Sequence, residues 1–200
     1  FTPATGLIRP EHQWSKAGSW GTATTMTRVA IMDDNGNLLP PGQPGEIVYR
    51  GPQVMTEYFN QPEKTEEAFK FGWFHSGDIA SIDEDGTIWF TDRKKDVIKT
   101  GGENVASIEV ERCLIGHPAV SEAAVIGVPH DRWGEAITAN VILMPGATAT
   151  EEELIEHCKT QIGGFKVPKA ILIVDEFPRT GTGKIQKHLI RKSLEGYYSD

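Results

Sequence analysis

The chain has 200 residues, of which 38% are apolar and 24% are charged, and its formal net charge is −8. This composition excludes collagen, coiled coils and wholesale disorder, and the acidic balance disfavours nucleic acid or an anionic membrane as a partner. The two cysteines are too few for a disulfide framework, and no apolar run is long enough for a transmembrane segment, so we expect a protein of the reducing cytoplasm.

The first part of the chain is predicted to be rich in β-structure. A short helix is expected after Asn60, because Pro62 suits a first helical position. A turn cluster and a proline-rich loop separate the first two strands, and a four-residue turn joins the last two as a hairpin. The expected strands cover residues 25–32, 46–50, 79–82 and 87–90. We therefore expect a distorted barrel at residues 1–94.

Helices and strands alternate in the second part of the chain. The expected helices cover residues 107–115, 150–162 and 184–194, and the expected strands cover residues 123–128, 137–143 and 170–174. Thr150 and Glu153 have the spacing of a capping box. The sequence therefore predicts an α+β fold, in which the β-rich subdomain is followed by a small α+β domain at residues 95–200.

The stretch from Pro178 to Lys184 is the most informative one for chemistry. Its two glycines let backbone N–H groups approach an anion, and the lysine adds a movable positive charge. A complete phosphate loop is excluded, because Pro178 occupies the place of the first glycine and Ile185 follows the lysine. Lys184 is thus interpreted as a mobile cation that meets a phosphate or carboxylate, or as part of a flexible surface loop.

Three further stretches each have a functional and a purely structural interpretation. The carboxylate of Asp78 could accept two hydrogen bonds from a ribose diol, or it could satisfy backbone donors in a turn. Gly101 and Gly102 follow Lys99 and either make a plain turn or let a ligand come close. The charged run at residues 92–96 is either a solvated face or a hinge. The His and Cys spacing predicts no metal site.

Four stretches in this order resemble motifs of the adenylate-forming superfamily, which contains acyl-CoA synthetases, peptide-synthetase adenylation domains and firefly-type luciferases. The resemblance covers nearly the whole chain and points to the C-terminal part of such an enzyme. Ser76 replaces a usual threonine of the family, and Lys187 replaces a common arginine. The matching stretches are residues 45–51, 73–78, 92–104 and 178–185.

The resemblance implies an AMP-forming acyl-CoA synthetase, and it implies a role for each of five residues of this chain. In this family a carboxylate attacks the α-phosphate of ATP to give an acyl-adenylate, and the thiol of CoA then displaces AMP. Asp78 and Arg93 would hold the ribose, and Lys184 would be catalytic between the carboxylate and the α-phosphate. Lys95 would be the hinge, and Lys99 would be the second catalytic lysine.

The resemblance also implies ligands and partners. Gly101 and Gly102 would meet the pantetheine of CoA, and ATP or AMP, CoA and Mg would bind, with the Mg ligands mainly upstream of Phe1. The small-molecule substrate would be a carboxylic acid, of the fatty-acid type judged from residues 127–135, and a homodimer is compatible with the family. The phosphate-loop motif is not found in the sequence, so we expect a fragment that is inactive alone. The alternatives are a non-catalytic module of the same fold that binds a nucleotide or a partner, and another adenylate-forming ligase.

Overall fold

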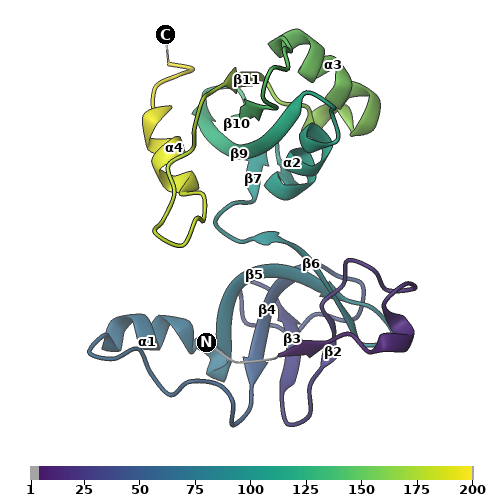
Figure 1. The fold of residues 1–200 in the computed structure, drawn as a ribbon. Helices are drawn as coiled ribbons and strands as arrows, with labels where there is room; N and C mark the ends of the chain where they lie inside the picture. Colours follow the sequence, from purple (N-terminus) through teal and green to yellow (C-terminus); the bar gives the residue numbers. More distant parts are fainter. Residues whose placement is uncertain (1–4, 200) are drawn as a thin grey trace. The chain divides into compact units, whose positions relative to one another are not determined.

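The computed structural model describes residues 5–199 and confirms an α+β fold (Figure 1). Contacts divide the chain into two compact units, Phe1–Lys95 and Asp96–Asp200, which we call unit 1 and unit 2. Each unit has its own sheet and its own hydrophobic core. None of the helices within residues 5–199 combines the length and the apolar character that crossing a membrane requires.

Unit 1 contains one six-stranded antiparallel sheet with the strand order β1-β2-β6-β5-β4-β3. The strands are β1 (Gly6–Leu7), β2 (Gly21–Ala23), β3 (Arg28–Met32), β4 (Gly45–Arg50), β5 (Phe74–Ile82) and β6 (Thr87–Arg93). Among the described residues β1 and β3 remain the two edges, so the expected distorted barrel is wrong in one respect: the sheet is not closed. Strand β1 at one edge and its neighbour β2 have only two and three residues, too few to continue the curvature needed for closure.

The helix predicted after Asn60 is α1 (Pro62–Ala68), and it begins with Pro62 and Glu63 as expected. Two 3₁₀ turns accompany it in unit 1, η1 (Pro10–His12) and η2 (Lys70–Gly72). The larger core of the unit lies on one face of the sheet, and a smaller buried cluster of Met32, Val48 and Trp73 lies on the other, since Val48 alternates with Ile47 along β4. The larger core contains Ile31, Ile47, Tyr49, Phe74, Ala80 and Ile88, all of which are buried.

Unit 2 is built around the long antiparallel pair β9 (Val120–His130) and β10 (Gly134–Leu143). Strand β11 (Ala170–Ile173) runs parallel to β10, and β10 also meets β7 (Ile98–Thr100) at Gly134. Strand β8 (Glu103–Val105) forms a hairpin with β7. The helical segments are α2 (Ser107–Ile115), α3 (Glu151–Gln161), η3 (Gly164–Lys166) and α4 (Lys187–Ser193).

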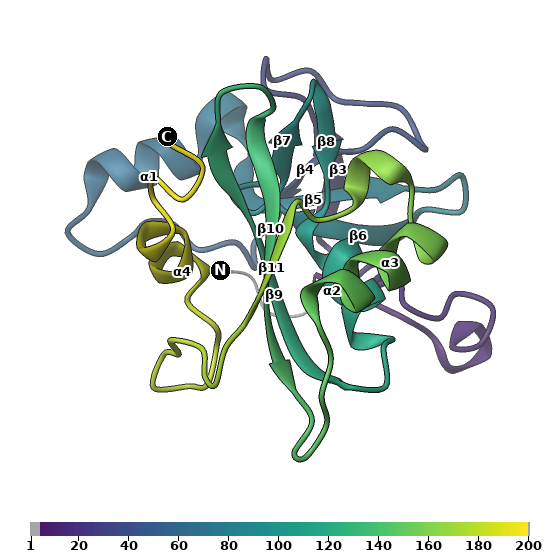
Figure 2. The same cartoon turned by 90° about the horizontal axis from the view of Figure 1, so that it is seen from above.

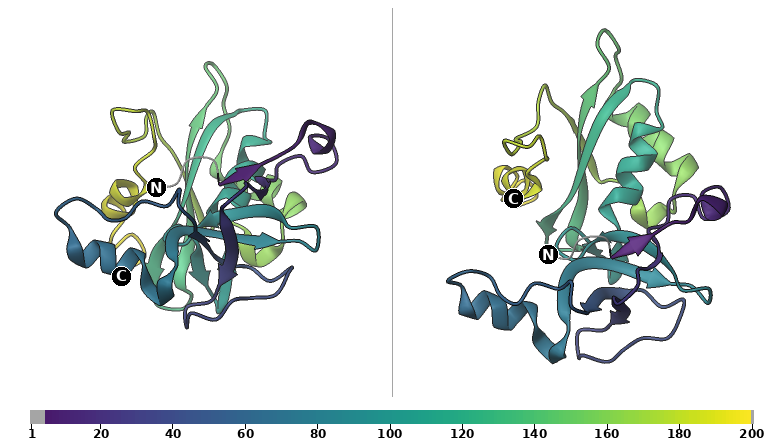
Figure 3. Two further views of the ribbon diagram at one scale, coloured as in Figure 1. Left: turned by 90° about the horizontal axis from the view of Figure 1, so that it is seen from below. Right: turned by 60° about the horizontal axis from the view of Figure 1, so that its bottom comes forward.

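The two faces of the unit 2 sheet are covered by different helices, with α2 and α3 on one face and α4 on the other (Figure 3). Alternation along β9 explains this arrangement, since successive side chains point to opposite faces. Val125 packs with residues of α2 and α3, whereas Ala124 and Ile126 pack with Ile190 of α4. Both faces of β9 are therefore buried, which accounts for its continuous apolar run.

Helix α4 begins at Lys187, three residues later than the sequence predicts. The carbonyl of Lys184 accepts a hydrogen bond from Thr180 N at 2.8 Å, so Lys184 lies in a closed turn before the helix. The short strands β7 and β8 flank Gly101 and Gly102, where the sequence predicts only a turn or a close approach to a ligand. Three residues are too few for an alternating pattern to stand out.

Candidate functional site

Asp78 and Arg93 are register partners on β5 and β6 of unit 1. Asp78 is half-buried and Arg93 is exposed. Burial raises the pKa of the Asp78 carboxyl, and the repulsion from Glu46 and Asp92 adds to this, whereas the charge of Arg93 lowers it; the net pKa is above its usual range. Within residues 5–199 no hydrogen bond reaches the carboxylate oxygens of Asp78. Two acceptor oxygens beside a guanidinium can therefore receive a vicinal diol.

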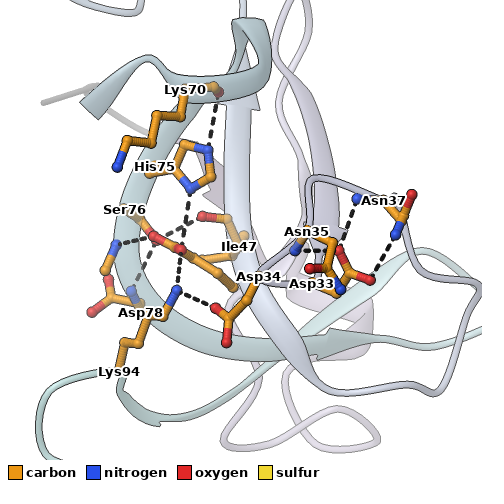
Figure 4. A network of polar contacts seen from close by, with 12 residues as sticks. Asp33, Asp34, Asn35, Asn37, Ile47, Lys70, His75, Ser76, Asp78 and Lys94 are labelled. Atoms are coloured by element: carbon orange, nitrogen blue, oxygen red, sulfur yellow. Dashed lines mark hydrogen bonds and ion pairs between the residues drawn. The ribbon is translucent and has the colours of Figure 1, made fainter. Parts of the chain in front are cut away.

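The backbone around Asp78 is fixed by polar contacts along β5 (Figure 4). The hydroxyl of Ser76 donates to Ile47 O at 2.7 Å and accepts from Asp78 N at 3.0 Å. Gly77 has φ +75°, in the left-handed region that favours glycine, and its carbonyl accepts from Lys94 N at 2.8 Å. Ser76 thus supplies the hydroxyl that the family motif places here as a threonine.

Glu46 of β4 is the centre of this network and is buried, with 9% of its side chain exposed. Its Oε1 accepts from Gly77 N at 2.9 Å, and its Oε2 lies 3.1 Å from His75 Nδ1 and 3.1 Å from Lys94 Nζ. Burial alone would raise the pKa of Glu46, but the bonds from His75, Gly77 and Lys94 outweigh it and lower the pKa. Lys94 also contacts Asp34 Oδ1 at 2.6 Å, so it is shared by two carboxylates.

A surface pocket of about 440 Å³ lies over this network. Its lining includes Glu46, His75, Gly77 and Lys94. Asp78 is outside the lining, so the pocket and the free carboxylate are neighbouring features of β5 rather than one cavity.

The chain leaves unit 1 and enters unit 2 at Lys94, Lys95 and Asp96. Lys94 is bound to unit 1 through its backbone N–H and its ammonium group. Asp96 is buried and lies 3.7 Å from Arg191 Nη2 of α4 in unit 2. Lys95 is exposed and stands between these two anchored residues.

Lys99, Gly101 and Gly102 are brought together by the β7–β8 hairpin. The Lys99 side chain is exposed, while its backbone N–H donates to Glu135 Oε2 at 2.7 Å. Both glycines have positive φ, +59° at Gly101 and +87° at Gly102, so the turn itself requires them. A Cβ at Gly102 would meet no atom within 4 Å, which leaves the tip of the hairpin open to a ligand.

Lys184 lies in a tight turn that precedes α4, and its side chain is exposed. The turn is closed by Gly183 N, which donates to Thr180 O at 2.8 Å, and by Lys184 N, which donates to Thr180 Oγ1 at 3.1 Å. Hydrogen bonds within the loop therefore hold the backbone of Lys184 in a defined turn.

The Lys184 turn and the Lys99 hairpin lie at opposite ends of the β9–β10 ladder (Figure 2). The turn is tied to Glu122, which pairs with Ile142, whereas the hairpin meets β10 at Gly134. Eight residues of an antiparallel strand separate these positions, a span of roughly 27 Å at the usual rise. Unit 2 therefore carries two separate candidate sites rather than one.

No group of three or more His, Cys, Asp or Glu side chains within residues 5–199 has a geometry suited to a metal ion.

Both parts of the chain match known families. Residues 1–59 match the AMP-binding enzymes, and residues 109–184 match the C-terminal domain of AMP-binding enzymes. The second match ends at Lys184. The chain belongs to the AMP-binding enzyme family.

Curated relatives and solved structures agree with this assignment. The chain is 43% identical over 190 residues to a feruloyl-CoA synthase of Amycolatopsis, which covers 95% of this chain and 39% of that enzyme. It is 42% identical over 186 residues to a long-chain-fatty-acid–CoA ligase of Mycobacterium tuberculosis, which covers 93% of this chain and 37% of that enzyme. This AMP-binding enzyme chain therefore spans about two fifths of the length of the relatives it matches.

Among solved structures, ATP-bound MatB from Rhodopseudomonas palustris is similar with a TM-score of 0.85 and 38% identity, over 91% of this chain and 37% of that one. The o-succinylbenzoate CoA synthetase of Bacillus subtilis, in complex with its acyl-adenylate intermediate, is similar with a TM-score of 0.86 and 34% identity, over 95% of this chain and 38% of that one. The fold of the AMP-binding enzymes is thus shared along nearly the whole chain.

Sequence reasoning missed three residues that organise these sites. Glu46 falls within the expected strand at residues 46–50, but no pattern in the sequence indicates that it joins Gly77 to Lys94. Arg179 and Glu122 were not singled out, although they form the ion pair that holds the Lys184 turn. The partners lie 31 to 57 residues apart, so no local spacing in a single sequence signals them.

Proposed function

We propose that these residues form the C-terminal part of an AMP-forming acid–thiol ligase, which joins a carboxylic acid to coenzyme A. The observation that carries the proposal is the identity of 42–43% over nearly the whole chain to relatives named as CoA synthases and ligases. The two-step chemistry implied by the family motifs supplies the roles of the residues.

In the first step the carboxylate attacks the α-phosphate of ATP, and pyrophosphate leaves. The attacking and attacked groups are both negative, so their approach needs a positive charge between them. Lys184 supplies that charge in this proposal, because it is exposed on an ordered turn and carries a long, mobile stem. A cation aimed at the α-phosphate oxygens stabilises the charge that builds there in the transition state.

Asp78 and Arg93 are proposed to hold the ribose of the nucleotide. The support is that Asp78 presents a carboxylate that accepts no hydrogen bond within residues 5–199 and that Arg93 is its register partner. The fixed backbone of Ser76 and Gly77 orients Asp78 before the ligand arrives, which reduces the entropy that binding must overcome.

Lys95 is proposed as the hinge between the two steps. Anchoring of Lys94 in unit 1 and of Asp96 in unit 2 leaves exposed Lys95 as the residue whose φ and ψ can change without breaking a contact. A hinge is required because Lys184 and Lys99 lie at opposite ends of unit 2, so one orientation cannot present both to the same bound substrate.

In the second step the thiol of CoA attacks the acyl carbon, and AMP leaves. Lys99, Gly101 and Gly102 are proposed to face the pantetheine, with the open tip at Gly102 giving the room. Mg²⁺ would accompany ATP in the first step.

We propose a fatty acid as the substrate and predict that the 200 residues alone form little acyl-adenylate, since their sequence lacks the phosphate-loop motif. The relatives bear on the acid only broadly, because their names include feruloyl-CoA, long-chain fatty acids and oxalate. We also predict a homodimer, which light scattering can test by measuring the molar mass in solution.

The test is to supply the enzyme that carries these residues with ATP, Mg²⁺, CoA and a panel of fatty, aryl and dicarboxylic acids. Acid-dependent release of pyrophosphate and AMP with formation of a thioester would support the proposal. Nucleotide binding without pyrophosphate release for any acid would favour the non-catalytic module, and adenylate formation without transfer to CoA would favour another adenylate-forming ligase.

A further inference from the structure

Arg179 stands at the base of the Lys184 turn. It forms an isolated antiparallel bridge with Ile185, which closes the turn from both sides. Phe177 and Ile185 pack against β9 together with Ile190 of α4. The two ends of the turn are therefore fixed on the sheet, while its tip projects from the unit.

The guanidinium of Arg179 makes two kinds of contact. Its Nη2 donates to both carboxylate oxygens of Glu122 on β9, at 2.7 and 2.6 Å, and its Nη1 donates to Gly183 O at 3.1 Å. One side chain thus links the sheet to the peptide that precedes Lys184. A planar group with several donors can do this, whereas a single ammonium cannot bind both acceptors in the same geometry.

We propose that Arg179 is a positioning residue for Lys184 and that Glu122 is its anchor on β9. This inference rests on the proposed role of Lys184 in adenylate formation. Because Lys184 has a flexible stem, the place of its ammonium depends on how firmly its backbone is held. A displacement of about 1 Å in a catalytic group can lower a rate by about 100-fold.

The test measures the two half-reactions separately in the enzyme that carries these residues. The variants are R179A, E122A and the double variant R179A/E122A, with E156A as the control. Glu156 makes an exposed ion pair with Lys159 on α3, so its loss removes one negative charge from unit 2 without touching the turn.

We expect R179A and E122A each to slow acid-dependent pyrophosphate release by about 10- to 100-fold. Thioester formation from supplied acyl-adenylate should change by less than about 2-fold, because Lys184 takes no part in that step. The double variant should be no slower than R179A, since both substitutions break one linkage.

The E122A variant distinguishes positioning of Lys184 from a purely electrostatic effect on adenylate formation. It leaves the guanidinium of Arg179 in place and removes a nearby negative charge, so a purely electrostatic role predicts unchanged or faster adenylate formation. An E122A variant at or above the wild-type rate would overturn the proposal. Equal loss in both half-reactions would also overturn it, because a general loss of folded protein affects both.

A second measurement on the 200-residue chain does not depend on activity. The ¹H–¹⁵N NOE of the Gly183 and Lys184 amides reports their order on the ps–ns timescale. We expect values like those of α4 in the wild type and lower values in R179A and E122A only. Unchanged values would refute the linkage, whereas lowered values together with an active Lys184→Ala enzyme would instead refute the proposed function.

Discussion

Glu46 offers the sharpest prediction for stability. Its buried carboxylate on β4 contacts Gly77 and His75 of β5 and Lys94, the residue that follows β6. Replacement by alanine removes the bonds to Gly77 N and His75 Nδ1, and it leaves these groups without their partner. At about 1.5 kcal/mol for each bond to a charged group, the loss is about 3 kcal/mol. The ion pair with Lys94 adds little, because 44% of the lysine side chain is exposed.

Glu46→Gln keeps an acceptor for Gly77 N and removes only the charge. We therefore expect a loss of about 1.5 kcal/mol, half that of Glu46→Ala. The assay is urea unfolding followed by tryptophan fluorescence in a W133F background. Trp133 is the single tryptophan of unit 2, and Trp73 is buried in unit 1, so the signal reports unit 1 alone.

The contribution of Glu46 to the free energy of unfolding depends on pH. The contacts lower the pKa of Glu46 in the folded state, so its contribution is present above the unfolded pKa of about 4.3 and is lost as the pH falls through the folded pKa. The gap between the wild type and Glu46→Gln should therefore shrink below about pH 4. Exposed Glu66 on α1 is the control, and E66Q should change little. A gap of equal size at pH 3 and pH 7, or no loss in Glu46→Ala, would refute the reasoning.

Three further predictions concern separate parts of the chain. Asp78→Asn should weaken AMP binding to the enzyme about 10-fold or more by calorimetry, and unchanged affinity would remove Asp78 from the ribose site. Burial raises the pKa of the Cys158 thiol to about 12, so iodoacetamide at pH 8 should spare Cys158 in the folded chain and modify half-buried Cys113 first; equal modification by peptide mapping would contradict this. Thr150→Ala should destabilise unit 2 by about 1 kcal/mol in urea, with Thr150→Ser as the tolerated control.

The sequence predicted best where local chemistry decides the structure. The capping box is confirmed, since Thr150 N donates to Glu153 Oε2 at 2.8 Å and Glu153 N donates to Thr150 Oγ1 at 3.2 Å. Helix α2 spans the predicted residues 107–115 because its apolar positions recur with the helical period. Pro62 begins α1 as expected.

The sequence predicted less where distant contacts decide. The sheet of unit 1 remains open because β1 and β2 are short, and length at an edge is not encoded in the pattern of the central strands. Helix α4 begins later than the sequence predicts, because Thr180 N donates to the Lys184 carbonyl and keeps Lys184 in a turn. Asp78 and Arg93 could be named from motifs, but the role of Glu46 emerges only when Gly77 and Lys94 are folded against it.

The central claim is that Lys184 acts in adenylate formation and not in thioester formation. It is tested most directly by measuring both half-reactions of Lys184→Ala in the enzyme that carries these residues. We expect pyrophosphate release to fall by about 100-fold or more, as for loss of a group that stabilises transition-state charge, while thioester formation from supplied acyl-adenylate stays within a few-fold of the wild type. Equal losses in the two half-reactions, or an undiminished release of pyrophosphate, would contradict the account.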